Sequence, residues 1–375
     1  MKKYTFLDLA KINAPYMEEL QQTTSRIVAG GRYIGGEEVA TFEQRLAQLC
    51  HTTHAIGTSN GLDALRLILR AYIEMGVMKK GDEVIVPTNS FIASALAITD
   101  NGLTPIFAEP DEFTHNLDCS KLERLITPHT RAIMTVHLYG RVSWSEDLRS
   151  LAAKYNLKII EDNAQAIGAT SPVAGLHDTF TTGGLGDAAA ISFYPTKNVG
   201  ALGDAGAITT RDSQLAEIVR ALANYGYSSG HYYSNYAGLN CRLDPIQAAV
   251  LNVKLPHVNT ENSYRQQIAD IYDNNITNRC VVMPLKRIDN EVVWYQYVIR
   301  VAERERFRQY LANNGVETAI HYPTPIHRQP CYKQFHHINL PIAEQLAREI
   351  ISLPISRCTS PDNARSISDI INQFK

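Results

Sequence analysis

The chain has 375 residues, with 36 basic and 38 acidic side chains and a formal net charge of −2. Its length exceeds one typical domain of roughly 100 to 200 residues, which fits a large domain joined to a smaller one. The charge balance leaves no overall basic excess of the kind that draws a protein to nucleic acid or membranes.

The six cysteines are scattered along the chain, without a C-x-x-C pair. An even count in a chain of this length does not indicate a disulfide framework, so we expect reduced thiols. The N-terminal residues lack the apolar core of a signal peptide, and no stretch approaches the roughly 20 apolar residues of a membrane span. We therefore expect a cytoplasmic protein.

Short apolar runs alternate with helical patterns through most of the chain. Strands are predicted at residues 84–86, 104–108, 132–136, 158–161, 189–193 and 206–209, and helices at 62–74 and 144–155. Such alternation argues for βαβ units and a parallel sheet. A polar helix predicted over residues 260–272 is interpreted as the bridge to a smaller domain. We therefore divide the chain into a large domain, 1–255, and a small C-terminal domain, 256–375.

A short polar turn, residues 58–61, precedes an apolar helical pattern that begins at Leu62. Free backbone N–H groups and the helix dipole make the start of a helix a good phosphate site. The alternative is ordinary N-capping by Ser59 or Asn60, which is the commoner use of such residues. The turn alone does not decide between these two explanations.

The apolar run Val84 to Val86 indicates a buried strand that ends at Pro87, and Phe91 follows it closely. Phe91 could stack on the ring of a cofactor, since aromatic pairs typically have centroids about 4.5 to 7 Å apart. Taken alone, an aromatic residue at this position is more often part of the core.

A later apolar strand runs directly into two carboxylates, Glu161 and Asp162. In parallel α/β sheets, functional groups gather where strands end at the carboxyl edge. An Asp there can pair with the ring nitrogen of pyridoxal 5'-phosphate and keep it protonated, so that the ring withdraws electrons from the substrate carbon. The alternative for Asp162 is a cap on the next helix, because Asp is a favoured N-cap residue.

Lys197 follows the apolar residues 188–193 and precedes the glycine-rich segment 200–206. The apolar residues before it indicate an interior position. An ordinary lysine has a pKa of about 10.4 and becomes an imine-forming nucleophile only where its surroundings favour the neutral amine. Alone, Lys197 would most simply be a surface residue. Together with Asp162 it has a complementary role toward pyridoxal phosphate, which makes it the candidate cofactor anchor.

Two polar clusters lie nearer the C-terminus. Asn240 belongs to a cluster just before a helical pattern, where a capped helix entry is the ordinary explanation. Residues 320–329 contain His321, Tyr322 and His327, donors suited to sugar hydroxyls or a diphosphate, in a chain stiffened by prolines. The alternative for this segment is a rigid surface loop. The remaining histidines do not form a convincing zinc set, so we expect no metal.

Taken together and in order, these segments resemble the DegT/DnrJ/EryC1/StrS family of sugar aminotransferases. The resemblance is carried by Ser59 to Gly61, Gly81 to Pro87, Val136 to Gly140, Glu161 to Gln165, Ser192 to Asn198 and Asn240 to Asp244. It spans nearly the whole chain, from residues 6–9 to residues 353–356. Any one segment would be weak, whereas the ordered set makes coincidence implausible.

The resemblance implies an α/β enzyme of fold-type I, with a mainly parallel seven-stranded sheet in the large domain and a smaller C-terminal α/β domain. It also implies a homodimer whose active sites lie at the subunit interface. It assigns Lys197 as the Schiff-base lysine and proton carrier, and Asp162 as the partner of the pyridinium nitrogen. The other implied cofactor contacts are Asn60, Gly61, Leu62, Phe91, Gln165, Ser192 and, from the other subunit, Asn240. The implied substrate contacts are Tyr33, Tyr194, His321, Tyr322 and His327.

The implied reaction is transfer of an amino group from L-glutamate to a nucleotide-linked keto sugar, with pyridoxamine 5'-phosphate as the intermediate form of the cofactor. The spelling of residues 321–327 resembles members that aminate dTDP-linked 3-keto-6-deoxyhexoses for amino-sugar biosynthesis, as in O-antigen or another surface glycan. A 4-keto-6-deoxyhexose enzyme is the rival within the family. A non-catalytic regulator that binds the cofactor would not need Lys197 and Asp162 together. Relatives that dehydrate sugars carry His in place of the lysine.

Two departures from the family pattern concern the site. Asn60, Gly61 and Leu62 stand where many relatives have Ser-Gly-Thr, so a threonine hydroxyl contact to the phosphate is absent. The segment between Gly168 and Gly186 is longer than usual, and it could alter access of the substrate.

Overall fold

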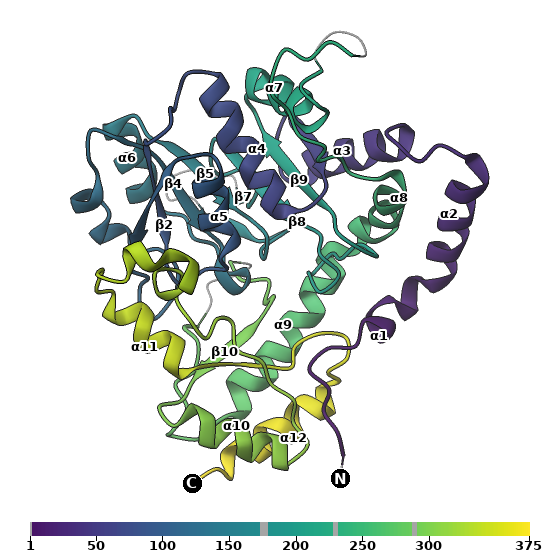
Figure 1. Cartoon of the computed structure of the whole chain (residues 1–375). Helices are drawn as coiled ribbons and strands as arrows, with labels where there is room; N and C mark the ends of the chain where they lie inside the picture. Colours follow the sequence, from purple (N-terminus) through teal and green to yellow (C-terminus); the bar gives the residue numbers. More distant parts are fainter. Residues whose placement is uncertain (1, 173–178, 228–231, 287–290) are drawn as a thin grey trace.

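The computed structural model describes residues 2–172, 179–227, 232–286 and 291–375, and a seven-stranded sheet lies at its centre (Figure 1). From one edge to the other the strands are β1 (His54–Thr58), β9 (Gly206–Thr210), β8 (Ala188–Ser192), β5 (Lys158–Asp162), β4 (Thr130–Val136), β2 (Glu83–Pro87) and β3 (Thr104–Ala108). Neighbouring strands from β8 to β3 are parallel. Only β9 runs antiparallel to its neighbours, β8 and β1.

Helices cover both faces of the sheet, because successive side chains of a strand point to opposite sides. One face packs against α4 (Gly61–Glu74), α5 (Ala93–Asp100) and α7 (Ser213–Ala223) through strand residues that include Ile56, Val84, Val86, Met134 and Ile208. The other packs against α3 (Glu37–Leu49), α6 (Glu146–Tyr155) and α8 (Pro245–Lys254) through alternate residues that include Ala55, Ile85, Ile133, Ile159 and Ile191. Each fully buried aliphatic side chain contributes about 1.5–3 kcal/mol, so the two apolar layers hold the sheet in place.

The C-terminal part forms a separate apolar cluster, drawn below the sheet in Figure 1. Its central helix is α9 (Val258–Asn275), which continues from α8 through the short helix η5 (Leu255–His257). Around α9 lie the antiparallel strands β10 (Tyr297–Arg300) and β11 (Ile350–Leu353), with α10 (Arg304–Asn313) and α12 (Pro361–Asn372). The cluster includes Ile268, Tyr272, Tyr297, Phe307 and Ile367.

The remaining elements are short or peripheral. The helices are α1 (Leu9–Asn13), α2 (Met17–Gly30) and α11 (Pro341–Glu349), and β6 (Thr170–Pro172) pairs with β7 (Thr179–Thr181) as a hairpin. The 3-10 helices are η1 (Ala14–Tyr16), η2 (Cys119–Lys121), η3 (Glu123–Leu125), η4 (Leu138–Gly140), η6 (Ile326–Arg328) and η7 (Pro330–Phe335). No described helix is both long and apolar enough to span a membrane.

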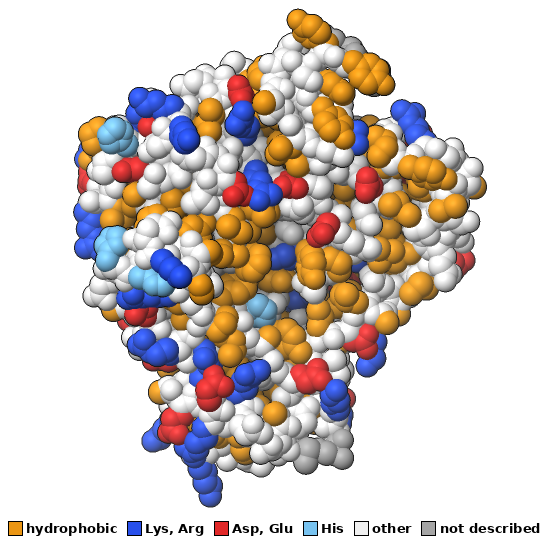
Figure 2. Space-filling model, in the orientation of Figure 1, with side chains coloured by type: hydrophobic (Ala, Val, Ile, Leu, Met, Phe, Trp, Pro, Cys, Tyr) orange, Lys and Arg blue, Asp and Glu red, His pale blue; other side chains and the backbone are white. Residues whose placement is uncertain are grey.

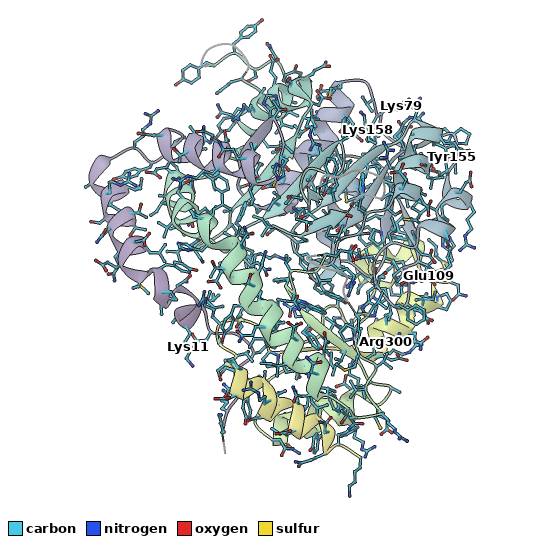
Figure 3. The ribbon with its side chains drawn as sticks, turned by 180° about the vertical axis from the view of Figure 1, so that it is seen from behind. Lys11, Lys79, Glu109, Tyr155, Lys158 and Arg300 are labelled. Atoms are coloured by element: carbon cyan, nitrogen blue, oxygen red, sulfur yellow. The ribbon has the colours of Figure 1, made fainter. Side chains whose placement is uncertain are left out.

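Polar contacts join the sheet layer to the C-terminal part where α11 meets the end of β3. Glu109, directly after β3, accepts hydrogen bonds of 3.0 Å from the N–H groups of Ile342 and Ala343. Arg300 of β10 pairs with Glu349 at 3.0 Å. Figure 3 shows Glu109 and Arg300 close to this junction, seen from behind. The first N–H groups of a helix have no intrahelical partner, so Glu109 ties the start of α11 to the sheet.

The predicted α/β fold with a mainly parallel seven-stranded sheet is confirmed. The predicted strands correspond to β2, β3, β4, β5, β8 and β9, although β8 begins and ends one residue earlier, which leaves Phe193 outside it. The edge strand β1, the β6-β7 hairpin and the β10-β11 pair are additions to that prediction. The hairpin occupies part of the long segment between Gly168 and Gly186, of which residues 173–178 lie outside the described residues.

Candidate active site

Lys197 lies in the loop that follows β8, and this loop is fastened at two points. The Lys197 N–H donates to the Tyr194 carbonyl at 2.8 Å. The side-chain amide of Asn198 donates to Asn262 Oδ1 of α9 at 2.8 Å and to the Val293 carbonyl at 3.1 Å. The chain therefore fixes the backbone of Lys197 between the sheet layer and the C-terminal part.

The Lys197 ammonium lies over the ring of Tyr295, with Nζ 4.3 Å from the ring centroid. A cation over an aromatic face is attracted by the ring quadrupole. Burial acts to raise the pKa of the Tyr295 phenol, but the Lys197 charge and hydrogen bonds from its neighbours outweigh burial and lower it. The charge on Lys197 thus acts directly on the pKa of the Tyr295 phenol.

Asp162 ends β5, and its side chain is only 6% exposed. Its carboxylate accepts a hydrogen bond from Ser94 Oγ at 2.8 Å and one from the Ala164 N–H at 3.2 Å. Burial raises the pKa of Asp162, against the opposing effects of Ser94, Ala164 and the Lys197 charge. Because the Lys197 charge acts on the Asp162 carboxyl, the two residues lie in one site.

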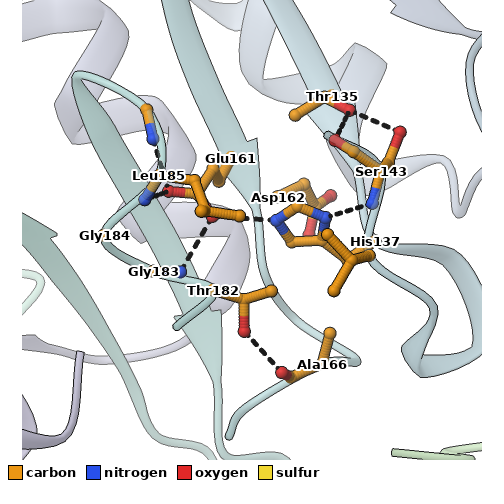
Figure 4. A network of polar contacts seen from close by, with 12 residues as sticks. Thr135, His137, Ser143, Glu161, Asp162, Ala166, Thr182, Gly183, Gly184 and Leu185 are labelled. Atoms are coloured by element: carbon orange, nitrogen blue, oxygen red, sulfur yellow. Dashed lines mark hydrogen bonds and ion pairs between the residues drawn. The ribbon is translucent and has the colours of Figure 1, made fainter. Parts of the chain in front are cut away.

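A buried network fixes the end of β5 from which Asp162 projects (Figure 4). The Ser143 N–H donates to His137 Nδ1 at 2.9 Å, so the proton of this imidazole is on Nε2, which donates to Glu161 at 2.8 Å. Glu161 also accepts hydrogen bonds of 2.8 Å from the N–H groups of Gly183, Leu185 and Gly186. The backbone N–H of His137 donates to the backbone carbonyl of Asp162 at 3.2 Å. These contacts leave the strand end little freedom to shift.

Gln165 and three aromatic residues form a wall beside Asp162. Gln165 accepts a hydrogen bond from the Tyr139 N–H at 2.7 Å and donates to the Tyr322 hydroxyl at 3.2 Å. The ring of Phe91 lies 5.3 Å from that of Tyr322, tilted by 41°. Phe91 is 53% exposed, so it is not a core residue and its ring is open to contact by a ligand.

The polar turn before α4 lies against Ser192, at the end of β8. Asn60 is the N-cap, and its Oδ1 accepts from the Asp63 N–H at 2.8 Å. The next N–H groups of the helix, at Gly61 and Leu62, have no intrahelical acceptor. A side chain at position 61 would place its Cβ 2.8 Å from Ser192 Cβ. Glycine thus allows the helix start and the Ser192 hydroxyl to meet, which creates a surface suited to a phosphate.

The predicted substrate residues do not all share one environment. His321 Nδ1 lies 2.8 Å from Ser352 Oγ, and burial together with the Lys197 charge lowers its pKa to about 4, so it is neutral at pH 7. Tyr194 is half-exposed just after β8. His327 is fully buried, with its nitrogens 2.7 Å from Thr88 Oγ1 and 3.2 Å from Glu344 Oε1.

Tyr33 and Asn240 lie on the surface of the chain. Tyr33 follows α2, is 56% exposed and donates its hydroxyl to the Val28 carbonyl at 2.9 Å. Asn240 is exposed and forms an isolated antiparallel bridge with Asn224. Within one chain, neither residue makes a described contact with Lys197 or Asp162.

Sequence reasoning missed Ser94, Tyr295 and Arg265 as residues of this region. Ser94 stands at the start of α5, shortly after the carboxyl end of β2, and that position is a usable signal. Tyr295 and Arg265 carry no comparable signal, because each reaches the site from the C-terminal part through tertiary packing.

Comparison with known proteins decides the family. Residues 16–372 match the DegT/DnrJ/EryC1/StrS aminotransferase family. The chain belongs to this family. Among relatives of this DegT/DnrJ/EryC1/StrS protein is the dTDP-3-amino-3,6-dideoxy-alpha-D-galactopyranose transaminase of Aneurinibacillus thermoaerophilus, which is 47% identical over 98% of this chain and 99% of its own length.

Two solved structures of similar proteins contain groups relevant to this site. DesV of S. venezuelae, described in complex with a ketimine intermediate, has a TM-score of 0.93 at 38% identity and covers 100% of this chain and 98% of its own. The ntda protein of Bacillus subtilis, described with bound cofactor pmp, has a TM-score of 0.89 at 28% identity, covering 100% of this chain and 86% of its own.

As a DegT/DnrJ/EryC1/StrS aminotransferase, the chain uses pyridoxal 5'-phosphate. When bound, this group withdraws electrons from the reacting carbon and carries an amino group between two substrates. The residues of the site fit it. Burial disfavours the charged form of Asp162, and a cationic ring nitrogen would offset that effect. The start of α4 with Ser192 suits a phosphate, and Lys197 supplies an amine.

Proposed function

We propose that the protein transfers an amino group from L-glutamate to a dTDP-linked 3-keto-6-deoxyhexose, in the biosynthesis of an amino sugar for a surface glycan. The observation that carries this proposal is that the charge of Lys197 acts on the buried carboxyl of Asp162 within one site. The 47% identical relative, named as a dTDP-3-amino-3,6-dideoxy-galactopyranose transaminase, supports the substrate class.

In this proposal Lys197 anchors the cofactor and moves the proton of the substrate, while Asp162 holds the ring nitrogen in its charged form. A positioned general base of this kind typically accelerates a reaction by about 10² to 10⁴-fold. Gln165 and Phe91 contact the ring. The phosphate is bound by Asn60, Gly61, Leu62 and Ser192, together with Asn240 from a second copy of the chain.

The sugar nucleotide is contacted by residues of the loops around this site: Tyr33, Tyr194, His321, Tyr322 and His327. The low pKa of His321 supports its part, because a neutral imidazole can accept or donate a hydrogen bond to a sugar hydroxyl. The Tyr322 hydroxyl already receives a hydrogen bond from Gln165. A contact between Tyr322 and the sugar nucleotide would therefore link the substrate to the residues beside the cofactor.

We also propose a homodimer with shared active sites. Exposed hydrophobic side chains support it, among them Met17, Val28, Tyr33, Ile34, Leu202 and Leu239. Figure 2 shows hydrophobic side chains gathered on the face of the molecule that is turned to the viewer in Figure 1, including the region of α2. Extended apolar patches of this kind mark interaction surfaces. A second copy there explains why Tyr33 and Asn240 lie on the outside of a single chain. Within each copy, we place the boundary between the large and small domains near residue 255.

The test of the reaction loads the protein with pyridoxamine 5'-phosphate and offers it a panel of dTDP-linked 3-keto and 4-keto hexoses. Products are identified by mass and NMR. We expect amination at C3. Amination at C4 would replace the proposal with the 4-keto class, and no amination at all would favour a cofactor-binding regulator.

The test of the anchor is borohydride reduction of the protein loaded with pyridoxal phosphate, followed by peptide mass mapping. We expect a pyridoxyl group on Lys197 in the native protein. Lys197→Ala should carry no such group and should not turn over. A fully active Lys197→Ala variant would refute the assignment.

A further inference from the structure

A small pocket of about 90 Å³ adjoins the site on the side of the C-terminal part. It is lined by Phe6, Leu7, Thr196, Arg265, Tyr295, Gln296, His321 and Ile355. We name it the Arg265 pocket. We propose that the Arg265 pocket binds the side-chain carboxylate of the amino donor, an inference that rests on the proposed aminotransferase reaction.

Arg265 is a buried cation without an anionic partner. Its side chain projects from α9 and is 6% exposed. One guanidinium nitrogen, Nη1, donates to the carbonyls of Trp294, Tyr295 and Ile355 at 3.2, 3.3 and 2.7 Å. Across the parts of the chain that the structure describes, no carboxylate forms an ion pair with it. Buried charges are normally paired, so an unpaired guanidinium beside a pocket marks a place for an anion.

Burial lowers the pKa of Arg265 to about 10, which leaves it charged at neutral pH. The carboxylate whose charge acts on Arg265 is Glu261. It is already engaged, because it pairs with Arg357 at 2.6 Å and accepts from the Tyr16 hydroxyl at 2.5 Å. Lys254 is a further buried cation in the same neighbourhood. The local charge is therefore positive, which favours an anionic ligand.

Gln296 provides a second, independent sign of a missing ligand. It is 6% exposed, and its side-chain Oε1 has no hydrogen-bond partner among the described residues. A buried polar atom left unpaired is unfavourable by about 1–3 kcal/mol. The Gln296 side chain also hydrogen-bonds Tyr295, so its oxygen is the atom that remains open to a ligand in the pocket.

The position of the pocket relative to Lys197 suits an amino acid whose amine reacts at the lysine. Tyr295 lines the pocket and also lies under the Lys197 ammonium, 4.3 Å from ring centroid to Nζ. Thr196, the residue before Lys197, lines the pocket as well. A ligand group in the pocket would therefore contact Tyr295 and Thr196, the same two residues that adjoin the reacting amine.

The shape of the pocket favours a carboxylate over the diphosphate of the sugar nucleotide. Phe6, Leu7 and Ile355 give it apolar walls that suit a short aliphatic chain. The planar guanidinium of Arg265 is suited to the two oxygens of a single carboxylate.

The test measures binding of glutarate to the pyridoxal-phosphate-loaded protein by calorimetry. Glutarate has two carboxylates and no amine, so it binds without reacting, and butyrate lacks the distal carboxylate. Arg265→Lys keeps the charge but loses the planar fork, and Gln296→Glu adds a negative charge to the pocket. Gln309→Glu makes the same change on the exposed face of α10, where Gln309 bonds only Asn313 among described residues, and serves as the matched control.

We expect both pocket variants to bind glutarate about tenfold to hundredfold more weakly than the native protein, the range for loss of one charge-assisted hydrogen bond. Their affinity for butyrate and for dTDP should match the native protein, as should all affinities of Gln309→Glu. Unchanged glutarate binding in Gln296→Glu would overturn the inference. This variant keeps the three carbonyl contacts of Arg265, so it remains a usable test if Arg265→Lys does not fold. A parallel loss of dTDP affinity would also overturn it, in favour of a diphosphate site.

Borohydride reduction separates this inference from the proposed function. A native protein that gains no pyridoxyl group on Lys197 would contradict the proposed reaction. A pyridoxyl group on Lys197 together with unchanged glutarate binding in the variants would leave the reaction standing and refute only the Arg265 pocket.

Discussion

Ser94→Ala tests how a hydrogen bond opposes the effect of burial on the pKa of Asp162. Ser94 Oγ donates to Asp162 Oδ2 at 2.8 Å, and both side chains are buried. The substitution removes this donor, and the smaller side chain introduces no clash. What remains is the 3.2 Å bond from the Ala164 N–H and the charge of Lys197.

The expected size follows from the kind of bond that is lost. A hydrogen bond to a charged group contributes about 1.5–3 kcal/mol, and 1.36 kcal/mol corresponds to one pKa unit, so the pKa of Asp162 should rise by about one to two units. The pKa of Asp162 in the native protein is already raised by burial. A raised carboxyl pKa means that the folded state holds its proton more tightly than the unfolded chain. Stability therefore falls as pH rises from the unfolded pKa through the folded one, and stays at the lower level above it.

The assay is urea unfolding of the cofactor-free protein across a pH series. Ser94→Ala should lose about 1.5–3 kcal/mol of unfolding free energy at pH 7.5, and this loss should shrink at lower pH, where Asp162 is protonated. The matched control is Ser368→Ala in α12, which removes a buried 2.9 Å bond to the Ala364 carbonyl far along the chain. Its loss should be about 0.5–1.5 kcal/mol and independent of pH. A pH-independent loss for Ser94→Ala would refute this account of Asp162.

Three further predictions concern the site and its supports. Gly61→Ala should lower stability by about 1–3 kcal/mol, because its Cβ would meet Ser192; thermal melting measures this, and dialysis should show weaker cofactor retention. Glu109→Ala should cost about 0.5–2 kcal/mol by removing the acceptor at the start of α11, and an unchanged melting temperature would contradict this. The imidazole of His321 should titrate near pH 4 by NMR and stay neutral between pH 5 and 8, and Lys197→Met should raise its pKa by removing a nearby cation.

The sheet and the first half of the site were predictable because the determining information is local. Apolar runs mark the strands, and parallel strands bring their carboxyl ends to one edge, which places Asp162 and the loop of Lys197 together. Asn60 shows the limit of this reasoning. The alternatives of helix cap and phosphate site are both compatible with the structure, since its side chain caps α4 while the N–H groups beyond it stay available.

The rest of the site depends on contacts between distant segments. The edge strand β1 pairs with β9, about 150 positions later, and its single short run carries no sign of that pairing. Glu161 lies in β5 and His137 directly follows the adjacent strand β4, so their pairing depends on the register between β4 and β5. Arg265 looks like an ordinary surface cation in a polar helix, and only the packing of α9 beneath the Lys197 loop buries it.

Asp162 and Arg265 have a similar energetic role in the site. One is a buried carboxylate whose pKa burial raises, and the other is a buried guanidinium whose pKa burial lowers, and neither forms an ion pair with a described residue. Each is unfavourable in the folded protein until a ligand of opposite charge arrives. The ring cation of the cofactor suits the first and the carboxylate of the donor suits the second. Binding of either ligand should therefore raise the melting temperature by relieving a different buried charge.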